Sequence, residues 1–227
     1  MKSDYAAVMT YVNRPDLLTR AVASMSDISE NLTIIDNSPD GIDFIIAPSK
    51  YLRPTYPLFF TQAINYALLE AKKTGCSFLL RQHADAMAHP GVCLKLVDMA
   101  RKLTAEGRKW GVIFTVYDTL AAFNLAVLDD VGLWDTVFPA YYSDNDWFRR
   151  IQLAGYEFIE SGLPMDHESS AALLSDPDLR FMNDQTFSLY GDYYKRKWGG
   201  APGHEKYLVP FNMVFAISRH QNETFNR

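Results

Sequence analysis

The sequence predicts an α/β fold: a mostly parallel central sheet covered by helices, followed by an aromatic-rich C-terminal tail. The first observation behind this prediction is alternation, because short apolar runs are followed by segments whose apolar residues recur at helical spacing. That order is typical of a parallel sheet with helices on its faces. The second is length, since 227 residues without a repeat or a linker fit a single domain spanning residues 1–227.

The first half of the chain contains most of the expected sheet. Pro15 ends the first apolar run and Asp16 begins a helical pattern, while Gly75 and Gly132 stop later helical patterns. Turn-forming residues at 37–41 separate the second strand from the third. We expect strands at residues 6–11, 32–35, 44–47, 78–80 and 111–117, and helices at 16–25, 61–73, 92–103 and 125–131.

The second half is less regular. Residues 144–153 have a helical pattern that Gly155 ends, and residues 156–160 form a short strand-like run. From Asp184 onward the chain is rich in aromatic residues and carries a basic run at residues 195–197. We expect this tail to wrap around the domain.

Composition excludes several classes of protein. A net charge of −5 and a pI near 5.5 argue against a broad nucleic-acid-binding surface. The only two cysteines, Cys76 and Cys93, exclude a disulfide scaffold and a four-thiolate zinc site, and we expect both to be small buried side chains. The first 20 residues do not have the pattern of a targeting peptide, and no apolar run approaches the roughly 18 residues of a transmembrane segment. We therefore expect a cytoplasmic protein.

Polar side chains gather where the predicted strands end. Asn13 follows the first strand, Asp36 ends the second, and His83 and Asp85 follow the fourth. The carboxyl ends of parallel strands form the edge at which such sheets bind ligands. The chain lacks a Gly-rich phosphate loop, a His-Glu-x-x-His motif and a Gly-x-Ser-x-Gly motif, which disfavours P-loop hydrolysis, zincin proteolysis and the α/β-hydrolase mechanism.

Some of these residues have the pattern of a metal site. His83 and Asp85 are two residues apart, so their side chains point to the same side of an extended segment. His167 follows a short strand far along the chain and supplies a possible third ligand. Carboxylate and imidazole groups with open water positions suit Mn²⁺ or Mg²⁺ that also holds a diphosphate. Each histidine alone is more often a surface or hydrogen-bonded residue, so the prediction depends on the combination.

Two further segments have both a structural and a functional interpretation. Ser143 or Asp144 is placed to cap a helix, and Asp144 at a helix start over a cleft is also placed to act as a general base toward a hydroxyl. A basic run is by default a solvated face, but Lys197 and Trp198, followed by two glycines, also suit a loop that folds over a phosphate or a sugar.

Five short motifs follow one another along the chain. They are Thr-Tyr-Val-Asn-Arg-Pro at 10–15, Ile-Ile-Asp-Asn-Ser at 34–38, Ala-Ile-Asn-Tyr-Ala at 63–67, a block with Gly-Leu-Trp-Asp at 132–135, Asp-Asn-Asp at 144–146 and Ala-Gly-Tyr at 154–156, and Lys-Trp-Gly at 197–199. In this order they resemble the family 2 glycosyltransferases, whose nucleotide-sugar-binding fold is known as GT-A. The resemblance covers about residues 5–200.

Two positions depart from that family's pattern. The family has Asp-x-Asp at its metal motif, where this chain has His83-Ala84-Asp85, and it has Glu where this chain has Ser143. The last Asp of the motif binds the metal in relatives and corresponds to Asp85. The acceptor-side carboxylate that remains corresponds to Asp144.

The resemblance implies a role for each half of the domain. About residues 1–120 would form the nucleotide-sugar-binding half, and about residues 121–227 the acceptor half and a closing tail. Asp85 and His167 would hold Mn²⁺ or Mg²⁺, and Asp144 would be the catalytic base. The residues implied for donor binding are Tyr11, Asn13, Arg14, Asp36, Asn65, His83, Lys197 and Trp198.

The first hypothesis is a metal-dependent inverting glycosyltransferase. It would move a sugar from a nucleotide-diphospho-sugar to the hydroxyl of a glycan, a lipid-linked molecule or another acceptor. The second is a catalytically silent module that binds nucleotide sugars, because His83 and Ser143 replace two acidic residues. The third is a nucleotidyltransferase on a similar sheet, which the acceptor-side block makes the weakest of the three.

Overall fold

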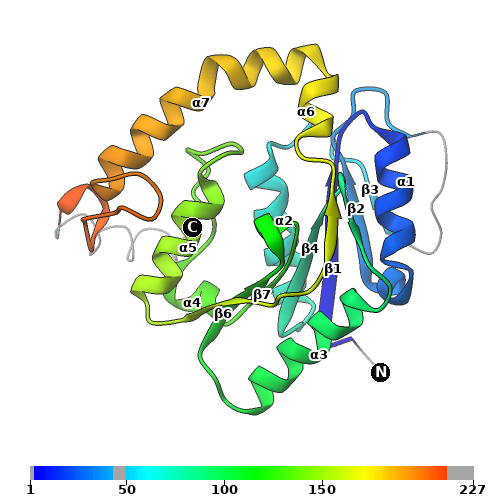
Figure 1. Ribbon diagram of the computed structural model, residues 1–227, viewed down its shortest axis with the longest axis horizontal. Coiled ribbons are helices and arrows are strands. Elements are labelled where there is room, and N and C mark those ends of the chain that lie inside the picture. The colour runs from blue at the N-terminus through cyan, green and yellow to red at the C-terminus, as the bar shows by residue number, and fades with distance from the viewer. Residues whose placement is uncertain (1–2, 43–49, 214–227) are drawn as a thin grey trace.

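The fold is α/β, with helices on both faces of a seven-stranded sheet (Figure 1). It is given by a computed structural model that describes residues 3–42 and 50–213. The strands are β1 (Tyr5–Tyr11), β2 (Leu32–Asp36), β3 (Lys50–Leu52), β4 (Phe78–His83), β5 (Ala86–Ala88), β6 (Trp110–Phe114), β7 (Leu120–Asn124), β8 (Glu157–Glu160) and β9 (Met165–His167). The α-helices are α1 (Pro15–Ser24), α2 (Phe60–Lys73), α3 (Val92–Ala105), α4 (Val127–Val131), α5 (Ser143–Leu153), α6 (Ala171–Ser175) and α7 (Pro177–Trp198).

The central sheet is mostly parallel, as predicted. Its strand order is β3-β2-β1-β4-β7-β6-β8, and β7 alone runs antiparallel to its neighbours. β5 and β9 form a separate antiparallel pair beside the end of β4. The carboxyl ends of β1 and β4 therefore lie next to each other, where Thr10 is in register with His83.

The alternation of side chains along the strands divides the core into two layers. In β1, Ala7 and Met9 belong to the layer under α1 and α3, while Val8 belongs to the layer under α2, α4 and α5. Both layers consist of fully buried apolar residues, which is what strands covered on both faces require. Figure 1 shows α1 and α3 on one side of the sheet and α2 and α5 on the other.

The C-terminal tail, which we expected to wrap around the domain, consists mainly of one long helix, α7. α7 begins at Pro177, and the Asp176 side chain caps it by accepting hydrogen bonds from the backbone N–H groups of Asp178 and Leu179, both at 3.0 Å. It ends at Gly199, which adopts a φ of +75°. In Figure 1, α7 arches from α6 across to the side of α5.

Most expected elements are present, with four corrections. β4 continues through His83 instead of ending at residue 80 as expected, so Arg81 and Gln82 are buried strand residues. Residues 120–124 form β7, and only the shorter segment 127–131 is helical. Tyr142, with φ +70° and no side-chain cap, precedes α5, so neither Ser143 nor Asp144 is its N-cap. The basic run 195–197 is the last turn of α7 and not a loop.

Two smaller expectations have separate outcomes. The strand predicted at 44–47 lies outside the described residues; a strand does follow at residues 50–52. Cys93 is buried, as expected, whereas Cys76 is partly exposed. Within the described ranges, no helix combines the length and the apolar composition that crossing a membrane requires.

A buried charge cluster fixes the end of α7 against α5. Lys197, whose side chain is 8% exposed, places its Nζ 2.6 Å from a carboxylate oxygen of Asp135 and 2.6 Å from one of Asp146. Asp146 is fully buried and also accepts hydrogen bonds from Trp198 Nε1 at 2.9 Å and from Arg150 Nε at 3.0 Å. Because each carboxylate oxygen of Asp146 has a cationic or N–H partner, the buried charges compensate one another.

This cluster predicts a large difference between two lysines on the same helix. Replacing Lys197 with Met leaves two acidic groups short of their cation, and we expect the free energy of unfolding to fall by about 3–5 kcal/mol. Lys195→Met removes a side chain that is 56% exposed and pairs with Asp192, so its effect should stay within about 0.5 kcal/mol. Urea unfolding of both variants measures this, and equal stabilities would contradict the role given to Lys197.

Candidate active site

A large cavity lies at the carboxyl ends of β1 and β4, under α7. Its volume is about 970 Å³, within the range of small-molecule sites in proteins. Its wall includes the end of β1, the end of β4, the loop before α5 and one face of α7. The titratable and cationic residues of that wall are Tyr11, Arg14, Arg81, His83, Asp85, Tyr141, Asp144 and Tyr190.

Strand pairing brings together three possible metal ligands. β5 pairs with β9 so that Ala86 is in register with His167, and the residue before Ala86 is Asp85. Nε2 of His167 is 3.4 Å from Oδ1 of Asp85. One ligand atom from each of His83, Asp85 and His167 lies within 4.8 Å of the other two. The sequence predicted this combination, although the residues are up to 84 positions apart.

The chemistry of these side chains fits a divalent ion. A carboxylate and two imidazoles suit Mn²⁺ or Zn²⁺ better than Mg²⁺, which prefers oxygen ligands throughout. Nη1 of Arg81 lies 2.9 Å from Nε2 of His83, and because a guanidinium only donates, Nε2 accepts this hydrogen bond and the imidazole proton is on Nδ1. That ring nitrogen of His83 is therefore occupied. Asp85 and His167, whose facing atoms have no other partner among the described residues, are the stronger pair of ligands.

Arg81 is a site residue that sequence analysis missed. Its side chain is 2% exposed, pairs with the Asp118 carboxylate, and lies between the rings of Phe60 and Phe123 at 5.6 Å from each centroid. Its Nε has no hydrogen-bond partner in the structure. Burial and the Arg81 charge hold the pKa of His83 well below its usual range, so His83 is neutral. The signal was a charged residue inside an apolar strand pattern.

Asp144 reaches the cavity from the start of α5. The preceding turn is held by Ser143, whose hydroxyl donates to the Ala140 carbonyl at 2.5 Å, and Asp144 itself accepts a hydrogen bond from the Asn145 N–H at 2.8 Å. Desolvation and, to a smaller extent, the negative charge of Asp118 raise the pKa of Asp144 to about 6. The carboxylate is therefore mostly ionised at neutral pH and can accept a proton there.

Five of the predicted site residues line the cavity together: Tyr11, Arg14, His83, Asp85 and Asp144. His167 lies beside them through its contact with Asp85. Asn13 follows β1 with a φ of +50°, and its side-chain amide donates to Asp176 at 2.7 Å. The Asn13 amide therefore holds the start of α7 instead of facing the cavity.

The other predicted donor-binding residues lie away from the cavity wall. Asp36 is 1% exposed and accepts hydrogen bonds from the Ser38 N–H and the Tyr51 hydroxyl. Asn65 is buried and bonds both ways to the backbone of Trp134, at 2.8 and 2.9 Å. Lys197 and Trp198 belong to the buried cluster described above. The structure does not bring these four residues to the site.

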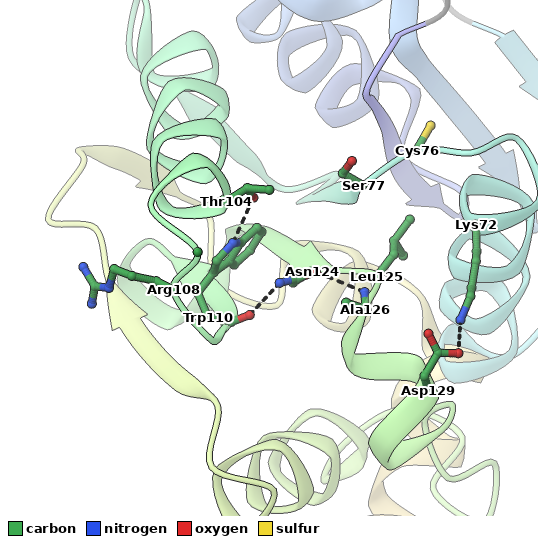
Figure 2. Close-up of a pocket in the computed structure, with 11 residues that line it drawn as sticks. Lys72, Cys76, Ser77, Thr104, Arg108, Trp110, Asn124, Leu125, Ala126 and Asp129 are labelled. Carbon is green, nitrogen blue, oxygen red and sulfur yellow. Dashed lines mark hydrogen bonds and ion pairs between the residues drawn. The ribbon is translucent and has the colours of Figure 1, made fainter.

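A second cavity, of about 410 Å³, lies at the other end of the strands, near the start of β4 and of β6 (Figure 2). Its charged residues are paired with one another or with neighbours: Lys72 with Asp129, and Arg108 with Glu157. Trp110 Nε1 donates to Thr104 Oγ1 at 3.1 Å. The larger cavity contains Asp144 and two of the three possible metal ligands, so it is the candidate active site.

Comparison with known proteins finds similarity in structure but not in sequence. No protein-family profile and no curated protein matches the chain. A protein assigned as a glucose-1-phosphate thymidylyltransferase of Bacillus anthracis, solved with sucrose, superposes with a TM-score of 0.50 at 8% identity, over 78% of this chain and 94% of that one. A cytidylyltransferase of Leptospira borgpetersenii gives a TM-score of 0.48 at 10% identity, over 82% and 96%.

Residues 1–349 of S. aureus TarS give a TM-score of 0.48 at 12% identity, over 66% of this chain and 55% of that one. The same TarS fragment has been solved with UDP-GlcNAc. The chain thus spans about half the length of the TarS fragment. At these identities the likeness to the thymidylyltransferase confirms the predicted α/β fold class.

The three possible metal ligands predict that Mn²⁺ stabilises the folded protein. At a hundredfold excess over its dissociation constant, an ion that binds only the folded chain stabilises it by about 2.7 kcal/mol, and we expect Asp85→Ala to abolish the effect. His89→Ala is the matched control, because His89 is exposed and pairs with Asp166 on the same two-stranded sheet. Thermal unfolding with Mn²⁺, Mg²⁺ and Zn²⁺ measures this, and an undiminished Mn²⁺ effect in Asp85→Ala would exclude the site.

Proposed function

We propose that the protein is a metal-dependent glycosyltransferase that moves a sugar from a nucleotide-diphospho-sugar to an acceptor hydroxyl. The observation that carries this proposal is that Asp144, a carboxylate poised to take up a proton, shares one cavity with Asp85, which His167 contacts from beside that cavity. A transfer to a hydroxyl needs a proton acceptor on one side of the sugar and stabilisation of a leaving diphosphate on the other.

The donor would bind at the strand-end side of the cavity. Tyr11 and Arg14 lie there, next to the end of β1. The proton on Nδ1 of His83 makes this neutral imidazole a hydrogen-bond donor, suited to a ribose or phosphate oxygen. A divalent ion held by Asp85 and His167 would offset the negative charge that develops on the diphosphate.

The acceptor would bind at the Asp144 side. The Asp118 carboxylate is engaged by Arg81 and that of Asp85 faces His167, which leaves Asp144 as the available base among the described residues of the wall. Asp144 takes the proton from the acceptor hydroxyl while the oxygen of that hydroxyl attacks the anomeric carbon, on the face opposite the diphosphate. A single displacement of this kind inverts the configuration of the sugar.

The second candidate function is nucleotidyl transfer. It is favoured by the fold that this chain shares with the thymidylyltransferase. In that reaction the attacking group is a phosphate oxygen that is already ionised, so no base is required. The carboxylate of Asp144 therefore supports glycosyl transfer. Release of a nucleoside diphosphate indicates glycosyl transfer, release of pyrophosphate from a nucleoside triphosphate indicates nucleotidyl transfer, and binding without turnover indicates a silent module.

Replacing Asp144 tests the proposal directly. A thermal-shift screen of nucleotide sugars with Mn²⁺ identifies the donor, and nucleoside diphosphate release over a panel of acceptors gives the rate. We expect Asp144→Asn to lower kcat by two to four orders of magnitude, because the amide cannot accept the proton, while the donor Kd changes little. Asp184→Asn, on the exposed part of α7, is the control. Unchanged turnover in Asp144→Asn would exclude the assigned base.

The raised pKa of Asp144 predicts a pH dependence with a definite sign. Below pH about 6 the carboxyl is protonated and cannot accept a proton, so kcat/KM should fall about tenfold per pH unit there. Asp118→Asn removes the nearby negative charge and frees the Arg81 cation, and both changes lower the pKa of Asp144. The acidic limb of the pH profile should therefore move to lower pH. A shift to higher pH would contradict this electrostatic coupling.

A further inference from the structure

One compartment of the active-site cavity is built almost entirely of uncharged, largely apolar side chains. The α7 residues that line the cavity are Leu179, Met182, Asn183, Thr186, Phe187 and Tyr190. They recur at positions i, i+3, i+4, i+7, i+8 and i+11, so they form one continuous stripe on a single face of the helix. No member of the stripe is charged.

The C-terminal part of this stripe faces two other uncharged walls. The ring of Phe187 lies 5.2 Å from that of Tyr141, and the ring of Tyr190 lies 6.4 Å from that of Phe138. The loop that carries these partners, residues 136–141, is bonded to the start of α2, where the Thr61 N–H donates to the Pro139 carbonyl at 3.1 Å. The lining residues of these two walls are Pro57, Leu58, Phe59, Phe60, Gln62, Thr136, Val137, Pro139, Ala140 and Tyr141.

The charged residues of the cavity wall are confined to the rest of the site. Among the described lining residues they are Arg14, Arg81, Asp85 and Asp144. Asp144 lies three residues after the loop at 136–141, so it stands where the charged part of the cavity meets the uncharged compartment. An occupant that matches this division has a hydroxyl-bearing polar head at Asp144 and an uncharged apolar body under α7.

We propose that the acceptor is an amphiphile with a sugar or alcohol head and a linear hydrocarbon chain, and that the chain lies between α7 and the loop at 136–141. This rests on the proposed function, because Asp144 fixes where the reacting hydroxyl sits. The seven helical steps from Asn183 to Tyr190 rise about 10 Å, which sets the length of chain that the compartment can cover. A phosphate or carboxylate in this compartment would lack a cationic partner from the described wall.

Alkyl β-D-glucopyranosides of increasing chain length test the proposal by binding alone. Titrations followed by tryptophan fluorescence, without donor or metal and below the micelle concentration, give a Kd for the methyl, butyl, hexyl, octyl and decyl glycosides. We expect the Kd to fall by up to about fourfold per buried methylene, and to level off once the chain exceeds the compartment. A Kd that does not depend on chain length would overturn the proposal, as would tighter binding of phenyl than of hexyl glucoside.

Substitutions on the two faces of α7 locate the bound chain. Phe187→Ser removes part of the proposed wall and should raise the octyl glucoside Kd about tenfold or more. The matched control is Phe181→Ser, because Phe181 is 67% exposed and does not line the cavity. Asn183→Leu adds apolar surface to the wall and should lower the Kd, a gain that misfolding cannot produce. Equal effects of the two Phe variants, or no gain with Asn183→Leu, would exclude this compartment.

The proposed function and the acceptor class fail in different ways. Chain-dependent binding that Phe187→Ser weakens, with no sugar transferred from any donor, supports the compartment and contradicts the glycosyltransferase. Sugar transfer at the same KM to methyl and octyl glucoside supports the glycosyltransferase and contradicts the amphiphile.

Discussion

The short pairing of β5 with β9 is the interaction on which the site depends. Only three residue pairs form it, yet it holds β9 beside the turn that follows β4. The Glu168 N–H extends the contact by donating to the Asp85 carbonyl at 2.9 Å. His167 thereby meets Asp85, and α6 and α7 begin above the end of β1. Without this pairing, the group of possible metal ligands and the cover of the cavity would both be lost.

Polar contacts then hold α7 at both ends and leave its middle over the cavity. Near its start, Asn13 bonds to Asp176, and Arg14 donates to the hydroxyl of the preceding residue, Ser175, at 3.2 Å. At its end, Lys197 is buried between two carboxylates. A helix fixed at its two ends can place an uncharged face over a site without packing that face into the core. This explains why the stripe at 179–190 stays partly exposed while the helix ends are well anchored.

The sequence predicted local patterns well and non-local pairing poorly. The apolar runs of β1, β2, β4 and β6 stand out because strands covered on both faces need continuous apolar residues. β7 was missed because its apolar run continues into the next helix, and periodicity cannot separate the two. His83, Asp85 and His167 were predicted as a group, because a shared ligand chemistry can be recognised without knowing which strands pair. The burial of Lys197 was not predicted, because a basic run in the sequence does not reveal the distant aspartates with which this lysine pairs.

Charge balance explains how a buried cation, Arg81, can lie beside the possible metal ligands. Arg81 is held by Asp118, so its positive charge is largely compensated before any ligand arrives. That compensation leaves Asp144 in surroundings with little net positive charge, and desolvation can then raise its pKa toward neutrality. The same compensation leaves Arg81 with little charge to offer an anionic donor. In the proposed reaction, a base poised near neutral pH and a diphosphate leaving group would make opposite electrostatic demands. Asp144 lies at the start of α5 and the possible metal ligands lie at the end of β4. This separation lets one cavity meet both electrostatic demands.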